Sequence, residues 1–176
     1  MAPFRIPFIV ALLNALLWLV QTQLNHAIAS WNLSVFLGGL AVAFASLRLT
    51  PREGAKVLVL TGLWFDAAAP VPFGLHAFFF LLAHVVIHSV RARLAREETL
   101  VGLIVAAIVN LGLLLALTAA LIHRNPAPLR LWPRLIADSL ASFSVLILIG
   151  PWFFAFSERV LEMCGVSLHR EQRGIV

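Results

Sequence analysis

The sequence predicts an all-α membrane protein, a bundle of six transmembrane helices, and two observations lead to this fold class. Of the 176 residues, 61% are hydrophobic and only 12% are charged, and the mean hydropathy is +0.97. Soluble domains carry about a quarter charged residues, so one small water-exposed domain cannot bury this much apolar surface. The apolar residues also form unbroken blocks without the period-two alternation of a membrane β-barrel, which favours helices.

Each of six apolar blocks is expected to form one transmembrane helix, because about 20 residues at 1.5 Å each cross roughly 30 Å of hydrocarbon. In chain order, the expected ranges are 4–24, 31–47, 54–68, 72–90, 100–122 and 133–156.

The third block, 54–68, is the shortest, about 22 Å long as a helix. It must therefore extend through Arg52 and Glu53, thin the membrane locally or end in a re-entrant turn. Pro70 and Pro72 terminate it, and Pro72 can open the fourth helix because proline fits the first helical turn.

The sixth block is expected to bend at Gly150-Pro151. We expect one six-span transmembrane domain, 1–157, because no linker divides it. Residues 158–176 mix apolar and charged residues, and they form either a continuation of the sixth helix or a short cytoplasmic or interfacial tail. At the other end, Ala27-Ile28-Ala29 imitates a signal-peptide cleavage site, but the long polar spacer before it favours a retained helix.

Basic residues predict the orientation of the chain. Ten of the thirteen fall on one side of a six-span chain: Arg5, Arg48, Arg52, Lys56, Arg91, Arg93, Arg96, Arg159, Arg170 and Arg173. The positive-inside rule places that side, with both termini, in the cytoplasm. The net charge of +5 then describes a cytoplasmic basic face, with Arg91, Arg93 and Arg96 at its centre, that meets anionic lipid headgroups rather than nucleic acid.

A few polar residues interrupt the apolar blocks near the predicted outer side. Asp66 and His76 flank the third loop, and Gln21 and Asp138 lie near the outer ends of the first and sixth helices. A carboxylate inside a membrane helix costs about 2.5 to 3.5 kcal/mol on insertion scales, so it usually faces the bundle interior or a water-filled cavity. Two interpretations stay open. The four residues line an outer polar cavity, or Asp66 and His76 pin a tight hairpin at headgroup depth.

His84 and His88 stand four residues apart on one helix face, which is a spacing that can hold a metal or haem. The zinc-protease motif needs a glutamate directly after the first histidine, and Val85 stands there instead. We therefore treat the pair as weak metal candidates and expect neutral histidines that bond to neighbouring helices. We expect no cofactor.

Ala11 and Ala15, with Asn14 between them, form a small-residue patch on the first helix that suits either helix packing or a protein partner. The sequence contains no serine-nucleophile motif, phosphate loop, carboxylate pair or multi-cysteine cluster, and its single cysteine, Cys164, cannot form an intrachain disulfide. The sequence therefore gives no reason to expect an enzyme.

The stretch GLWFDAAAPVPFGLHAF, residues 62–78, resembles the region around the third and fourth helices of the rod shape-determining protein MreD family. The resemblance rests on a G-x-x-x-D motif followed by P-x-G, here Gly62, Asp66, Pro72 and Gly74, and on a basic loop that follows the helix. His76 comes two residues after this motif.

The resemblance implies a non-catalytic scaffold in the inner membrane of a bacterium, which assembles with an MreC-like protein and other proteins of the cell-elongation, peptidoglycan-synthesising machinery. Such proteins are similar in layout to the substrate-binding subunits of energy-coupling-factor vitamin transporters. The alternative is therefore a solute-binding subunit, with a small molecule in the outer polar cavity and the Ala11/Ala15 patch against a transport module.

Overall fold

A computed structural model of the chain describes residues 5–69, 71–93, 98–122 and 131–166. Within these ranges the protein is helical and contains no strand. Its elements are α1 (Arg5–Ile28), η1 (Ala29–Trp31), α2 (Gly38–Arg48), α3 (Pro51–Ala68), α4 (Leu75–Val90), η2 (Arg91–Arg93), α5 (Thr99–Leu121) and α6 (Leu131–Met163). The prediction of an all-α protein is confirmed.

Four helical segments of the described chain are long and apolar enough to cross a membrane: Arg5–Trp31, Leu75–Arg93, Thr99–Leu121 and Trp132–Met163. Their outward faces carry large apolar side chains such as Phe8, Val85, Ile108 and Trp152, each more than half exposed. A soluble monomer rarely exposes so much contiguous apolar surface. The helices are therefore those of a membrane protein.

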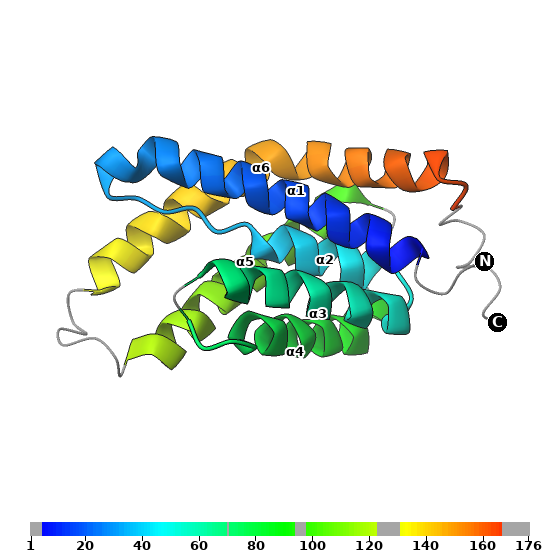
Figure 1. Cartoon of the computed structure of the whole chain (residues 1–176), viewed down its shortest axis with the longest axis horizontal. Coiled ribbons are helices and arrows are strands. Elements are labelled where there is room, and N and C mark those ends of the chain that lie inside the picture. Colours follow the sequence, from blue (N-terminus) through cyan, green and yellow to red (C-terminus); the bar gives the residue numbers. More distant parts are fainter. Residues whose placement is uncertain (1–4, 70, 94–97, 123–130, 167–176) are drawn as a thin grey trace.

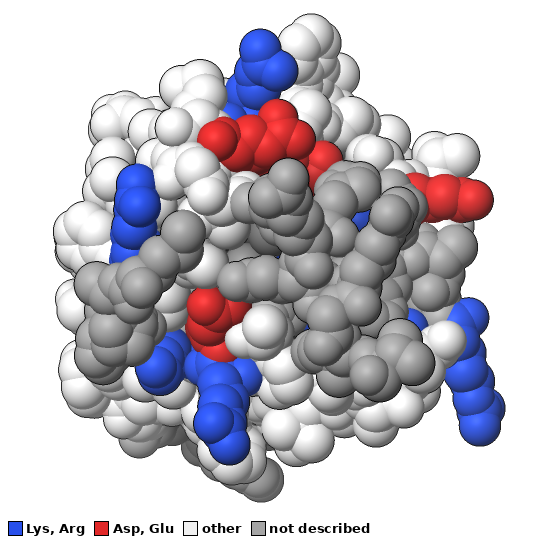
Figure 2. Space-filling view, turned by 90° about the vertical axis from the view of Figure 1, so that its right-hand side faces the viewer, with Lys and Arg blue, Asp and Glu red and all other residues white. Residues whose placement is uncertain are grey.

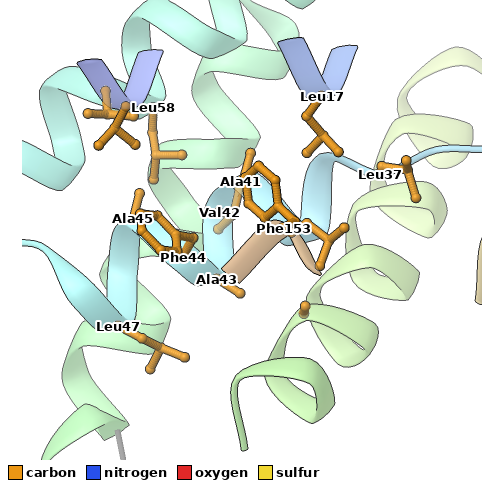
Figure 3. Packing of buried hydrophobic residues seen from close by; sticks show 14 of the residues in the cluster. Leu17, Leu37, Ala41, Val42, Ala43, Phe44, Ala45, Leu47, Leu58 and Phe153 are labelled. Atoms are coloured by element: carbon orange, nitrogen blue, oxygen red, sulfur yellow. The ribbon is translucent and has the colours of Figure 1, made fainter. Parts of the chain in front are cut away.

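Successive helices run in alternating directions, so that every second connection lies at the same end of the molecule (Figure 1). α2 lies at the centre and packs against α3, α4, α5 and α6. All eleven of its residues are buried, as expected for a helix that is apolar on every side. In Figure 3, Leu58 of α3 and Phe153 of α6 lie around the central run from Ala41 to Ala45.

The second predicted helix, 31–47, is wrong in its first third. Asn32 has a left-handed backbone with a φ of 57°, residues 33–37 are not helical, and α2 begins only at Gly38. The resulting helix of 11 residues is about 16 Å long, too short to cross the hydrocarbon by itself. The apolar composition of 31–47 could not reveal the break, because the groups that stabilise it lie on other helices.

α3 starts at Pro51 and so includes Arg52 and Glu53, the first of the three solutions expected for the short third block. The Thr50 hydroxyl caps it by accepting a bond from the Glu53 amide at 3.4 Å and donating one to Oε2 of Glu53 at 2.8 Å. The helix is about 27 Å long. Its four charged residues, Arg52, Glu53, Lys56 and Asp66, keep it out of the group of strongly apolar helices.

α6 runs without interruption from Leu131 to Met163, although Pro151 lies inside it. The ribbon changes direction between its yellow and orange parts, as expected for a proline-containing helix (Figure 1). The helix passes the predicted end of the sixth block at residue 156 and continues into the predicted tail. Up to residue 163 that tail is a continuation of the helix; residues 167–176 lie outside the described chain.

Candidate functional site

The α3–α4 turn brings the residues of the G-x-x-x-D and P-x-G motif together. Asp66, on the last turn of α3, is only 4% exposed. Its Oδ1 atom accepts a hydrogen bond from the His76 amide at 2.9 Å and lies 2.9 Å from Nδ1 of the His76 ring. Its Oδ2 atom accepts from the amides of Gly74 at 2.9 Å and Ala77 at 3.4 Å. These amides begin α4 and lack partners within the helix, so Asp66 caps α4 from a neighbouring helix.

Two glycines of the motif make this geometry accessible. Gly74 has a φ of +95°, a conformation that other residues adopt at a cost. A Cβ atom on Gly62 would stand 2.3 Å from Cα of Ala77, so α3 and α4 approach closely only because residue 62 has no side chain. Pro72 accepts a bond from the Leu75 amide at 3.1 Å and completes the turn.

The His76 ring packs among aromatic rings, with centroids 5.7 Å from Phe65, 6.0 Å from Phe80 and 6.2 Å from Phe36. Phe36 belongs to the non-helical segment that precedes α2. The α3–α4 turn and this segment are therefore in direct contact.

Side chains of α1, α5 and α6 bind the backbone of the segment 34–37. The Asp138 carboxylate accepts a hydrogen bond from the Ser34 amide at 2.7 Å, and the Gln21 side chain accepts one from the Leu37 amide at 2.8 Å. Asn25 makes two hydrogen bonds with the Val35 backbone. Its Oδ1 atom accepts from the amide at 2.6 Å, and its Nδ2 atom donates to the carbonyl at 2.9 Å.

Two further side chains complete this network. The Ser142 hydroxyl accepts from the Phe36 amide at 3.0 Å. Asn110 of α5 donates to the Phe36 carbonyl at 2.8 Å and accepts from the Gly39 amide at 3.0 Å. Side chains of other helices thus bind the backbone of five residues, Ser34, Val35, Phe36, Leu37 and Gly39, in place of bonds that a helix would have supplied internally.

The structure therefore divides the four residues of the predicted outer cavity into two adjacent groups. Asp66 and His76 bind each other and the α4 terminus, whereas Gln21 and Asp138 bind the segment 34–37. None of the four lines either of the two grooves described below. Sequence reasoning did not find Asn25 and Ser142 as members of this network, because an amide or a hydroxyl near a helix end is unremarkable until the backbone it binds is known.

His84 joins the two ends of the α2–α3 connection. Its Nδ1 atom lies 2.9 Å from the Ser46 hydroxyl and its Nε2 atom 3.1 Å from the Pro51 carbonyl. The His88 ring is 6.1 Å away, and no cluster of three potential metal ligands forms within the described ranges. Both ring nitrogens of His84 are thus occupied by the protein.

The basic face lies at the end of the molecule where α1 starts and where α2, α4 and α6 end (Figure 1). Figure 2 looks onto this end and shows Lys and Arg side chains around its rim. Arg91 is buried and donates to the carbonyls of Ser46 at 3.0 Å and Leu49 at 2.7 Å, at the C-terminus of α2. Arg48 pairs with Glu158 at 2.7 Å. Arg93 is exposed, and Arg96 lies outside the described residues.

The small-residue patch of α1 lines a groove against α3 with a volume of about 270 Å³. Its lining includes Ala11, Asn14, Ala15, Leu60, Thr61 and Trp64. A second groove, of about 220 Å³, lies between α4 and α5 and is lined only by apolar residues and glycine, among them Phe79, Ala83, Val86, Val109, Gly112 and Ala116.

Comparison of the chain with known protein families, curated proteins and solved structures finds no match.

Proposed function

We propose that this protein is a non-catalytic scaffold in a bacterial inner membrane that binds partner proteins of the cell-elongation, peptidoglycan-synthesising machinery. One observation carries the proposal: Asp66, His76, Gln21 and Asp138 all hydrogen-bond to the chain itself. A solute-binding subunit needs several polar groups that converge on a cavity and remain free for the ligand. Here these groups hold the fold together, which favours the scaffold over the solute-binding alternative.

The proposed topology has six membrane crossings. The non-helical residues 32–37 add at most about 20 Å to the 16 Å of α2, so that together they match a hydrocarbon core of roughly 30 Å. A non-helical stretch is tolerated at this depth when protein surrounds it and its backbone is hydrogen-bonded. The alternating directions of the helices then place both termini on the side of the basic face, which the positive-inside rule assigns to the cytoplasm.

The resemblance to the MreD family gains support from the contacts of its motif. Gly62 permits the close approach of α3 and α4, Gly74 provides the left-handed turn, and Asp66 caps α4. The motif is therefore a structural unit that sets the geometry of the α3–α4 turn, in agreement with a scaffold that presents a fixed surface to an MreC-like partner.

Depletion of the protein in its rod-shaped host tests this function. We expect the cells to become round, because wall synthesis along the cylinder loses its membrane scaffold, while vitamin uptake stays unchanged. The measurements are cell width by microscopy and uptake of labelled vitamins, with a plasmid copy of the wild-type gene as the control. Unchanged rods with reduced uptake of one vitamin would instead establish the solute-binding subunit.

A biochemical test addresses the partners directly. The tagged protein is purified in mild detergent and the co-purifying proteins are identified by mass spectrometry. The scaffold proposal expects an MreC-like protein and wall synthases, enriched over an untagged control. Enrichment of a transporter ATPase pair would support the alternative.

A further inference from the structure

The five tryptophans fall into two groups. Trp18 and Trp64 contact each other, with ring centroids 6.0 Å apart, whereas Trp31, Trp132 and Trp152 are 72%, 54% and 79% exposed. An indole ring joins a large apolar surface to one N–H donor, and such rings are enriched at the boundary between lipid hydrocarbon and headgroups. The positions of the second group along the bundle therefore indicate where the membrane lies.

The spacing of two tryptophans on α6 matches the thickness of a bilayer. Trp132 and Trp152 stand 20 residues apart, which is about 30 Å along a helix and equals a typical hydrocarbon core. The only charged residues between them are Arg134 and Asp138, which pair at 3.6 Å. The half-exposed Arg134 lies close enough to Trp132 for its long side chain to reach the headgroups. The bend at Pro151 comes only at the end of this stretch.

Trp31 gives independent evidence for one of the two boundaries. The Ser34 amide binds the Asp138 carboxylate at 2.7 Å, so residue 34 lies at the level of residue 138. From this level Trp132 is six residues, about 9 Å, back along α6, and Trp31 is three residues, at most about 10 Å, back along the chain. The segment then runs inward to Gln21, two turns inside α1. Trp31 and Trp132 therefore stand at a similar level, at the end where α1 finishes and α6 begins (Figure 1).

Charged residues follow Trp152 at the other boundary. Glu158 lies six residues, about 9 Å, past Trp152 and pairs with Arg48 at the C-terminus of α2 at 2.7 Å. Arg159 and Glu162 come next and are exposed. Charges are costly in hydrocarbon, so residues from 158 onward favour the headgroup layer and water. The boundary at this end therefore falls between Trp152 and Glu158.

We propose that the rings of Trp132 and Trp152 bind the two headgroup boundaries of the bilayer, so that lipid hydrocarbon surrounds residues 133–151 of α6. The last three turns of α6 then extend into the headgroup layer and water. Lipid rather than a partner protein covers both rings, because they point about 160° apart around the helix and no single partner helix reaches both. Asp138 lies about 9 Å inside this slab along α6, where the Ser34 amide and Arg134 supply the partners that a carboxylate at this depth needs. This inference is independent of the proposed scaffold function.

The charges of α6 alone would place the membrane differently. Asp138 and Glu158 also stand 20 residues apart, and no charged residue lies between them. A slab bounded by these two carboxylates is centred at residue 148, whereas the slab bounded by the tryptophans is centred at residue 142. The two placements differ by six residues, about 9 Å, which a measurement of depth can resolve.

Spin labels on α6 provide that measurement. In a Cys164→Ser background, Leu140→Cys and Leu148→Cys each place one nitroxide on a residue that is 64% or 72% exposed, with both tryptophans retained. The protein is reconstituted into vesicles of phosphatidylethanolamine and phosphatidylglycerol. Collisions with oxygen, which concentrates in hydrocarbon, are compared with collisions with a water-soluble nickel chelate. We expect the label at 140, about 3 Å from the centre, to have a higher ratio of oxygen to nickel collisions than the label at 148, about 9 Å from it.

Three further labels complete the profile. Trp132→Cys and Trp152→Cys should give similar, low ratios, and Met163→Cys, at a residue that is 76% exposed, should collide with the nickel chelate as freely as a label in water. If a tryptophan variant fails to fold, the pair at 140 and 148 still decides between the two placements.

Two results would overturn the inference. A label at 148 that lies deeper than the label at 140 would establish the slab bounded by Asp138 and Glu158. Exclusion of both reagents from position 152 would show that a second copy of the chain, and not lipid, covers this site. Neither result bears on the scaffold function, which the depletion experiment tests separately.

Discussion

Four hydrogen-bond donors converge on the two carboxylate oxygens of Asp66: three backbone amides and one ring nitrogen of His76. Two of the three amides belong to the first turn of α4, where no helical carbonyl is available to them. The carboxylate therefore supplies to α4 what a residue at its own N-terminus normally supplies. Gly74, which holds that position, has no side chain that could do so.

Replacing Asp66 with alanine should lower the free energy of unfolding by about 2 to 3 kcal/mol, because capping bonds to a charged acceptor are lost in a buried site. Thermal unfolding in detergent measures the change. Glu98→Ala is the matched control, since Glu98 also precedes a helix but makes no side-chain cap bond to α5. It should change stability by no more than about 0.5 kcal/mol. Equal effects of the two substitutions would contradict the capping role.

At the scale of single residues, the sequence identified Asp66 and His76 for a sound reason. An ionisable group in an apolar run requires partners, so its presence alone indicates a buried contact. Asn25 and Ser142 were not among the predicted site residues, because an amide or a hydroxyl near a helix end costs little and does not by itself indicate a buried contact. These two side chains matter because they bind the Val35 and Phe36 amides. The local sequence predicts that both amides belong to a helix.

At the scale of the elements, α3 and α4 are in close backbone contact at Gly62. The Cβ atom of an alanine there would meet the backbone of Ala77 at 2.3 Å from Cα and 2.5 Å from N. Backbone atoms cannot turn aside as a flexible side chain can. The two helices must therefore move apart to accommodate even one methyl group.

Gly62→Ala should consequently destabilise the protein by about 1 to 3 kcal/mol, the usual cost of overpacking. The fraction of monodisperse protein that survives heating, followed by size-exclusion chromatography, provides the measurement. Gly112→Ala on α5 is the control, because its added Cβ meets nothing within 4 Å. This control should leave stability unchanged or raise it slightly through better helix propensity. A neutral Gly62→Ala would show that the two helices are not held in close contact.

The non-helical segment before α2 depends on Asn110. Its side chain donates a hydrogen bond to the Phe36 carbonyl and accepts one from the Gly39 amide. Asn110→Leu keeps a similar volume but leaves both groups without a partner. We expect a loss of about 1 to 3 kcal/mol for each unpaired group, measured by thermal unfolding. Ser144→Ala is the comparison, because this exposed hydroxyl bonds only to Leu140 of its own helix. If both variants unfold at the same temperature, the segment does not need its side-chain partners.

The predicted elements agree with the structure where one local property decides them. Apolar length predicted α1, α5 and α6. For the short third block three solutions were open, and α3 adopts one of them, the extension through Arg52 and Glu53. The prediction for the second block is wrong in its first third, because residues 33–37 have the apolar composition of a membrane helix. Their conformation is stabilised by α1, α5 and α6, whose positions no local pattern contains.

On the scale of the whole molecule, basic residues gather at one end of the helix bundle and not along one of its sides. Arg5, Arg52, Arg93 and Arg159 all lie where helices begin or finish at one end of the bundle, whereas Arg134 lies at the start of α6 at the other (Figure 1). Arg134 also pairs with Asp138 at 3.6 Å, one turn further along α6. The larger number of basic residues at one end is the physical basis of the proposed orientation.

Cysteine accessibility distinguishes this arrangement from one with fewer crossings. In a Cys164→Ser background, Trp31→Cys and Arg93→Cys place single thiols on exposed residues at opposite ends of the bundle. A membrane-impermeant maleimide should label residue 31 from outside the inner membrane and residue 93 only after the membrane is opened. The wild-type protein, with Cys164 beyond the end of α6, should behave like the residue 93 variant.

The decisive comparison is between positions 31 and 93, because three segments separate them: residues 32–48, α3 and α4. If all three cross the membrane, the two thiols lie on opposite sides. If residues 32–48 enter and leave on the same side, only α3 and α4 cross, and both thiols are labelled together. That second result would reduce the protein to five crossings and place its termini on opposite sides of the membrane. Labelling on opposite sides would instead require the α2 segment to complete its crossing through the backbone that Asn110, Gln21 and Asp138 hold in place.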